Sequence, residues 1–119
     1  EVPVKVAKRL FSSETARETM HLMEAVIARD EGTGHKLRIP GYRLAGKTGT
    51  AQKVGSVGGH IANFVGYVPA EKPKAVILVM VDAPKGAAYY GGTVAGPVFR
   101  ELAKSVVRRY RIPPSVDAK

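Results

Sequence analysis

The sequence predicts an α+β fold, a mixed α/β arrangement in which helices flank an antiparallel sheet. Three strand-like segments follow one another at residues 42–54, 61–68 and 75–82. The connectors between them contain GSVGGH and PAEKPK, which are shorter than the roughly dozen residues that a parallel crossover needs. A helical apolar period precedes the strands and a second one follows them. We therefore expect the order helix, three antiparallel strands and C-terminal helix.

The first helix is expected to begin at Ser12 or Ser13, since either serine can cap its free N–H groups, after a strand-like opening at residues 2–11. Four apolar side chains, spaced by four, three and four residues, share one face of this helix: Ala16, Met20, Met23 and Ile27. Gly32 and Gly34 are predicted to end it, because glycine readily adopts the left-handed conformation found after helix C-termini.

The third strand-like segment, AVILVMVD at residues 75–82, is apolar without interruption and is predicted to be buried on both faces. The last helix is expected between Gly92 and Tyr110, with Gly96-Pro97 in its first turns, where a missing proline N–H costs least. Its predicted apolar stripe consists of Val98, Leu102, Ala103, Val106 and Tyr110. Pro113-Pro114 follows and stops the helix.

The composition excludes several classes of site. The absence of cysteine rules out disulfides, thiol catalysis and cysteine-ligated zinc. The three histidines, His21, His35 and His60, lack metal-ligand spacing, so we expect neither a metal nor a cofactor. The net charge is +9, but the basic residues are scattered and their densest cluster, 108–111, falls at a predicted helix end that favours cations. We therefore expect no nucleic-acid partner.

The segment GYRLAGKTGT, residues 41–50, supports two incompatible hypotheses. Residues 41–48 match the phosphate-loop pattern G-x-x-x-x-G-K-[ST], and the apolar run ending at Asp82 is the kind of strand that holds magnesium in such proteins. A phosphate loop must open into a helix, however, and the glycines at 49, 55, 58 and 59 make a poor helix. A nucleotide-binding module and a basic nucleic-acid-binding domain remain as alternatives, and the first requires a helix beginning near Lys47.

The second hypothesis starts from Lys47-Thr48-Gly49, the third signature of serine acyl-transfer enzymes that bind penicillin. On a strand, Thr48 and Thr50 share one face while Lys47 points to the other. Two hydroxyls beside a cation can hold a substrate carboxylate, and an outward backbone N–H can stabilise an oxyanion. Gly49 would let a ligand backbone approach closely. Taken alone, the three letters fit equally well an exposed edge strand whose Lys and Thr face water.

The wider sequence resembles the C-terminal part of the transpeptidase domain of class B penicillin-binding proteins, most closely the cell-division type. Four segments in order carry the resemblance: SSETARETMHLMEAVI, GYRLAGKTGTAQKV, VGYVPAEKPKAVILVMVDAPKG and AAYYGGTVAGPVF. The resemblance implies the penicillin-binding transpeptidase fold, and a peptidoglycan D,D-transpeptidase that cross-links stem peptides by serine acyl transfer during septal wall synthesis. It also implies β-lactam binding, division-machinery partners and a parent protein at the bacterial inner membrane, with its catalytic domain facing the periplasm or cell exterior.

Carried over to this sequence, the resemblance implies a role for each residue of the third motif and for a later loop. Lys47 belongs to the catalytic polar network, Thr48, Gly49 and Thr50 bind the carboxylate of the substrate or β-lactam, and the Thr50 N–H supplies half of the oxyanion hole. One wall of the cleft is formed by Tyr89, Tyr90, Gly91 and Gly92.

The other two motifs of that family are missing. No serine of the chain has lysine three positions later, and the only asparagine, Asn63, is preceded by Ile61-Ala62 rather than by S-x. We therefore expect residues 1–119 to be roughly the last third of a transpeptidase domain, which supplies no nucleophile. Such a fragment should be inactive alone and should need the N-terminal remainder of the same domain as its partner.

Overall fold

The computed structural model describes residues 8–54, 59–86 and 89–115. The elements run in the order α1 (Ser13–Ala28), the 3-10 turn η1 (His35–Leu37), β1 (Ala45–Gln52), β2 (His60–Val68), β3 (Ala75–Asp82), α2 (Gly91–Val94) and α3 (Gly96–Arg109). The predicted order of helix, strands and helix is confirmed, with the short α2 added before the last helix. The strand-like opening lies mostly outside the described residues, and Lys8–Leu10, which are described, are not in a strand.

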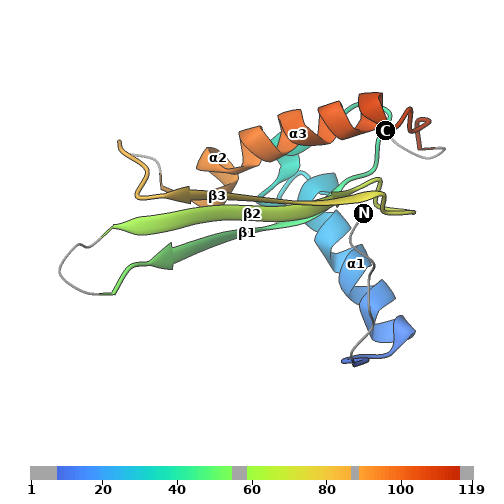
Figure 1. The fold of residues 1–119 in the computed structure, drawn as a ribbon, viewed down its shortest axis with the longest axis horizontal. Coiled ribbons are helices and arrows are strands. Elements are labelled where there is room, and N and C mark those ends of the chain that lie inside the picture. Colours follow the sequence, from blue (N-terminus) through green and yellow to red (C-terminus); the bar gives the residue numbers. More distant parts are fainter. Residues whose placement is uncertain (1–7, 55–58, 87–88, 116–119) are drawn as a thin grey trace.

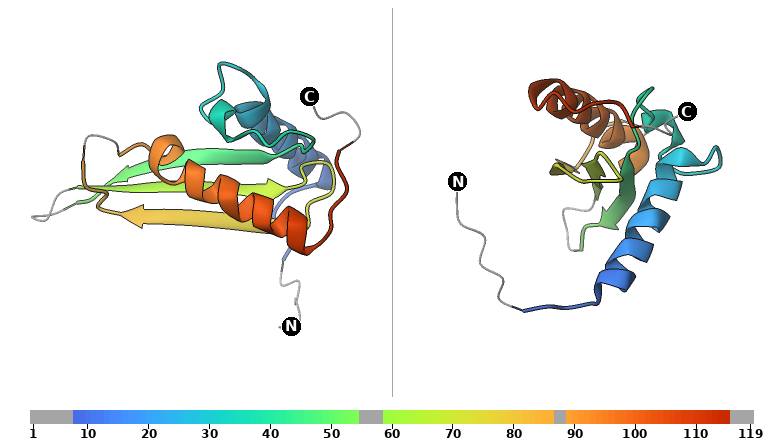
Figure 2. Two further views of the ribbon diagram at one scale, coloured as in Figure 1. Left: turned by 90° about the horizontal axis from the view of Figure 1, so that it is seen from above. Right: turned by 90° about the vertical axis from the view of Figure 1, so that its right-hand side faces the viewer.

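The three strands form one antiparallel sheet in the order β1-β2-β3, as predicted. In the register of β1 with β2, Thr48 lies opposite Phe64 and Thr50 lies opposite Ala62. Within the described residues, β1 and β3 are therefore the two edges of this sheet. Helix α3 lies along one face of the sheet, while α1 contacts the other face near one end, as the two views of Figure 2 show (Figures 1 and 2).

Helix α1 begins as predicted but ends earlier. The Ser12 hydroxyl accepts a hydrogen bond from the Thr15 N–H at 3.1 Å, so Ser12 is the N-cap. The predicted ending at Gly32 and Gly34 is wrong, since the helix stops at Ala28 and Arg29 is already extended. Gly34 has a φ of −110° and is not a left-handed cap. The guanidinium of Arg38 instead donates to the last carbonyls of the helix, at Ile27 and Ala28.

The main core lies between α3 and the sheet. Phe64 on β2 and Phe99 on α3 are fully buried, with ring centroids 4.7 Å apart. The buried side chains of α3 are Phe99, Ala103 and Val107, so the predicted stripe is confirmed at Ala103 and, as a partly buried residue, at Val106, but it missed Phe99 and Val107. Three of its predicted members are exposed: Val98, Leu102 and Tyr110. Both stripes have helical spacing, and only the contact with the sheet selects between them.

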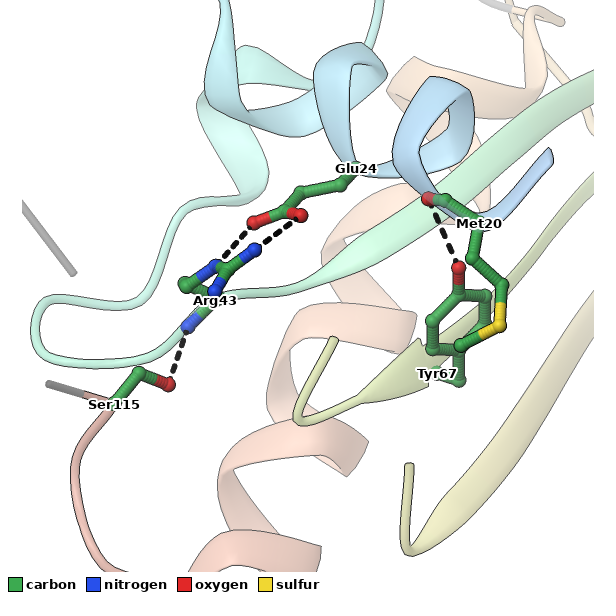
Figure 3. A network of polar contacts seen from close by, with 5 residues as sticks. All are labelled: Met20, Glu24, Arg43, Tyr67 and Ser115. Carbon is green, nitrogen blue, oxygen red and sulfur yellow. Dashed lines mark hydrogen bonds and ion pairs between the residues drawn. The ribbon is translucent and has the colours of Figure 1, made fainter. Parts of the chain in front are cut away.

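A second contact joins α1 to the sheet and fixes the start of β1 (Figure 3). The Arg43 guanidinium donates to both carboxylate oxygens of Glu24 at 2.5 and 2.7 Å, and the Arg43 N–H donates to the Ser115 hydroxyl at 3.1 Å. The Tyr67 hydroxyl donates to the Met20 carbonyl at 3.1 Å. Burial, and to a lesser extent the Glu24 charge, raises the pKa of Tyr67. These contacts hold the strand that carries Lys47-Thr48-Gly49 against α1 and the C-terminal segment.

The prediction that β3 is buried on both faces is wrong for this chain. Val79 is buried against α3, but Val76, Leu78 and Met80 on the opposite face are 73%, 60% and 61% exposed. The reason is that α1 packs on that face of the sheet against β1, which leaves the same face of β3 uncovered. An exposed row of apolar side chains on a strand is unusual for a folded protein, because burial of apolar surface is favourable.

Candidate functional site

The free edge of β1 carries outward-facing backbone groups at both threonines. The Lys53 N–H donates to the Gly59 carbonyl, so these two residues form a hydrogen-bonded pair at the end of the β1–β2 ladder. Antiparallel ladders alternate between hydrogen-bonded and non-hydrogen-bonded pairs. Counting back along the register, residues 51, 49 and 47 point their N–H and carbonyl groups at β2. Thr48 and Thr50 therefore point theirs away from the sheet.

The hydroxyls of the two threonines lie on the face that bears α2, and each has a defined neighbour. The Thr50 hydroxyl accepts a hydrogen bond from the Gly91 N–H at 3.2 Å. The Thr48 hydroxyl lies 3.2 Å from the Lys47 Nζ and 3.5 Å from the Thr33 hydroxyl. Thr33 belongs to the loop after α1, and nothing in its local sequence indicated that it would reach this strand.

Lys47 starts on the opposite face, as strand alternation predicts, but its ammonium does not stay there. Its Nζ donates to the Thr48 carbonyl at 3.0 Å, so the side chain bends around the free edge of β1. One cation, two hydroxyls and two outward N–H groups thus meet along four residues. This is a set of donors suited to a carboxylate and to an oxyanion.

Close packing explains why glycine occurs at 49 and 91. A Cβ at Gly49 would overlap the Asn63 side-chain amide, and a Cβ at Gly91 would overlap the carbonyl oxygens of Asn63 and Gly49. The Asn63 side chain thus occupies the space beside Gly49, where the sequence suggested that a ligand backbone would approach. Gly92 is also close, since a Cβ there would lie 3.0 Å from the Thr33 carbonyl.

The two predicted wall tyrosines form a stack with His60. The rings of Tyr89 and Tyr90 have centroids 4.5 Å apart, and the Tyr89 hydroxyl donates to the Tyr90 hydroxyl at 3.2 Å. This hydrogen bond is the main reason that the pKa of Tyr89 is raised. The His60 ring stacks on Tyr89 at 4.3 Å. The stack lies beside the motif because Gly91, which follows it, contacts Thr50.

The described residues contain binding groups but no recognisable nucleophile with its base. Ser12 caps α1, and the Ser115 hydroxyl accepts from the Arg43 N–H. Within 8–54, 59–86 and 89–115 there is no group of three or more His, Cys, Asp or Glu that could hold a metal. No helix in these ranges is long and apolar enough to cross a membrane.

The phosphate-loop hypothesis is wrong. A phosphate loop delivers its glycine-rich turn into a helix, whose first N–H groups hold the anion. Residues 47–52 instead continue as a strand in register with β2. The alternation of residues along β1, which the other hypothesis required, is confirmed.

Comparison with known proteins gives the same answer over nearly the whole chain. A family model described as the penicillin binding protein transpeptidase domain matches residues 1–104. The peptidoglycan D,D-transpeptidase FtsI of Escherichia coli (strain K12) is 39% identical over 116 residues, covering 94% of this chain and 20% of the relative. Stage V sporulation protein D of Bacillus subtilis (strain 168) is 40% identical over 111 residues, covering 90% and 17%. The chain thus spans about a fifth of the length of these relatives.

Solved structures agree with this result. The transpeptidase domain of Burkholderia pseudomallei penicillin-binding protein 3 is 38% identical with a TM-score of 0.79, covering 92% of this chain and 34% of that chain. Penicillin-binding protein 3 of Mycobacterium tuberculosis, solved in complex with ampicillin, is 31% identical with a TM-score of 0.76, covering 92% and 27%. Sequence, fold and the Lys-Thr-Gly strand all lead to one conclusion: the chain belongs to the family of penicillin-binding protein transpeptidase domains.

Proposed function

We propose that residues 1–119 supply the carboxylate-binding and oxyanion-binding strand of a peptidoglycan D,D-transpeptidase. The observation that carries this proposal is the free edge of β1, where the outward N–H groups of Thr48 and Thr50 lie beside two hydroxyls and the Lys47 ammonium. A stem peptide ends in a D-alanine carboxylate, and charge-assisted hydrogen bonds from such donors are well suited to it. A β-lactam presents a comparable carboxylate beside its reactive carbonyl.

In the proposed reaction, a serine outside this chain attacks the penultimate D-alanine carbonyl. The Thr50 N–H stabilises the oxyanion, and the peptide bond breaks to release terminal D-alanine. An amine on a neighbouring peptidoglycan strand then attacks the acyl-enzyme ester, which forms the cross-link and releases the serine. Lys47 contributes its charge to the polar network of the site, and Tyr89, Tyr90, Gly91 and Gly92 line one side of the cleft.

The N-terminal remainder of the same transpeptidase domain is the proposed partner of this chain. The exposed row of Val76, Leu78 and Met80 supports it, since this apolar surface lies on β3, which is an edge strand of the sheet within the described residues. Beside that edge a groove of about 460 Å³ runs between β3 and α3. The matched Burkholderia transpeptidase domain is about three times as long as the stretch that this chain covers, which leaves enough protein to cover both.

The relatives support a proposal for the cellular setting of the parent protein. The FtsI relative bears the name of a peptidoglycan D,D-transpeptidase, which supports a role in cell-wall synthesis. We propose that the parent protein acts in septal synthesis together with division proteins. Its transpeptidase domain would then face the periplasm or cell exterior from the inner membrane.

Thr50→Val tests the proposed function in the complete protein. The substitution removes a hydroxyl but keeps a β-branched side chain of similar shape, so it should slow acylation by a fluorescent penicillin roughly 10- to 100-fold. That range corresponds to one lost hydrogen bond to a charged group. The second-order acylation rate constant is the quantity to measure, and Thr50→Ser, which keeps the hydroxyl, should stay within a few-fold of the wild type. Unchanged acylation of Thr50→Val would contradict the assigned role.

A further inference from the structure

The Thr50 hydroxyl has one hydrogen-bond partner among the described residues, and that partner is a backbone donor. The Gly91 N–H points at the Thr50 Oγ1 at 3.2 Å, from the first residue of α2. A hydroxyl has one proton to give and two lone pairs to accept with. Because one lone pair is occupied by the Gly91 N–H, the hydroxyl proton is left to donate in another direction. At the free edge of β1 that direction is available to a ligand.

We propose that Gly91 is a positioning residue, which fixes the Thr50 hydroxyl so that its proton faces the ligand carboxylate. The proposal rests on the proposed function, in which Thr50 binds that carboxylate. It also gives Gly91 a role different from that of a passive wall. The donor polarises the hydroxyl as well as orienting it, because hydrogen bonds in a chain strengthen one another.

The packing around Gly91 shows why this contact depends on glycine. A Cβ at position 91 would overlap the carbonyl oxygens of Asn63 and Gly49 and lie 3.1 Å from the Gly49 nitrogen. These atoms belong to the paired backbones of β1 and β2, which cannot move aside as the end of a flexible side chain can. Gly91 therefore sits directly on the strand pair, and any larger residue must lift its N–H away from Thr50.

Thr48, two residues earlier on the same face, has a different environment. Its hydroxyl faces the Lys47 ammonium at 3.2 Å, a group that can itself donate to a carboxylate. The Thr50 hydroxyl is instead held by a backbone N–H at the start of α2. The two hydroxyls thus have different neighbours: the Thr48 hydroxyl lies beside the Lys47 ammonium, whereas the Thr50 hydroxyl accepts from the Gly91 N–H.

The test uses the complete protein and two acylating agents, benzylpenicillin and its methyl ester, which lacks the carboxylate charge. Gly91→Ala should lower the acylation rate constant for the acid about tenfold and for the ester by less than threefold. The effect should disappear when Thr50→Val is already present and persist in Thr50→Ser. A merely structural role predicts equal losses for acid and ester, and additive losses in both backgrounds.

The outcomes separate this proposal from the proposed function. If Thr50→Val slows the acid selectively but Gly91→Ala does not, then the positioning role is wrong and the carboxylate role stands. If Thr50→Val slows acid and ester equally, then the carboxylate role is wrong, and the positioning role fails with it.

A second measurement applies even if Gly91→Ala does not fold. Amide hydrogen exchange at Gly91, followed by NMR in the complete transpeptidase domain, should be about tenfold faster in Thr50→Val than in the wild type. Thr50→Ser keeps the acceptor and should exchange at the wild-type rate. Equal exchange of the Gly91 amide in wild type and Thr50→Val would overturn the proposal, because it would mean that the hydroxyl does not hold this N–H.

Discussion

Residues 1–119 expressed alone should form no covalent adduct with labelled penicillin, whereas the complete protein should carry one on a serine outside this chain. The chain offers binding groups at the edge of β1 but no S-x-x-K sequence. Among the described serines, Ser12 and Ser115 accept hydrogen bonds from backbone N–H groups as structural contacts. Without a nucleophile and its base, the oxyanion donors have no tetrahedral intermediate to stabilise.

Peptide mapping by mass spectrometry makes this first prediction specific. The complete protein is labelled, digested and searched for the penicilloyl mass on every serine peptide. The labelled peptide should come from outside residues 1–119, and the isolated chain, checked for folding by circular dichroism, should remain unlabelled. A penicilloyl group on any serine of this chain would contradict the division of roles that we propose.

Leu78→Lys should strongly destabilise the complete transpeptidase domain, although Leu78 is 60% exposed in this chain. If the N-terminal remainder covers this face of β3, the substitution buries an unpaired charge. We expect the free energy of unfolding to fall by about 3–5 kcal/mol, the usual cost of an uncompensated buried charge. Denaturant unfolding of the complete domain, monitored by circular dichroism, measures it.

Leu22→Lys serves as the matched control for Leu78→Lys. Leu22 on α1 is 72% exposed, so the same chemical change should alter stability by less than about 0.5 kcal/mol. A small effect of Leu78→Lys, equal to that of the control, would mean that this face of β3 stays in water. The remainder of the domain would then have to pack elsewhere.

The elements were predictable because their signals are local. The helical spacing of Met20, Met23 and Ile27, the Ser12 cap and the short connectors between strands each depend on a few neighbouring residues. The errors arose where distant segments decide. Helix α1 ends at Ala28, where Arg38, ten residues later, donates hydrogen bonds to its last carbonyls. Phe99 of α3 is buried because its ring packs against Phe64 on the sheet.

The candidate site was predictable in its motif but not in its supports. The order Lys47-Thr48-Gly49-Thr50 on a strand was enough to place the hydroxyls on one face. Three contacts came from parts of the chain with no local signal: Gly91 on Thr50, Thr33 on Thr48 and His60 on Tyr89. They join residues on different segments that are 15 to 41 positions apart, and only the fold brings them together.

The most direct test of the central claim is a crystal structure of the complete protein acylated by benzylpenicillin. We expect Lys47–Thr50 to remain a strand, the penicilloyl carboxylate to lie within about 3.2 Å of the Thr50 hydroxyl, and the ester carbonyl oxygen to accept from the Thr50 N–H. A carboxylate bound away from both Thr48 and Thr50, with the carbonyl oxygen held by other donors, would contradict the account.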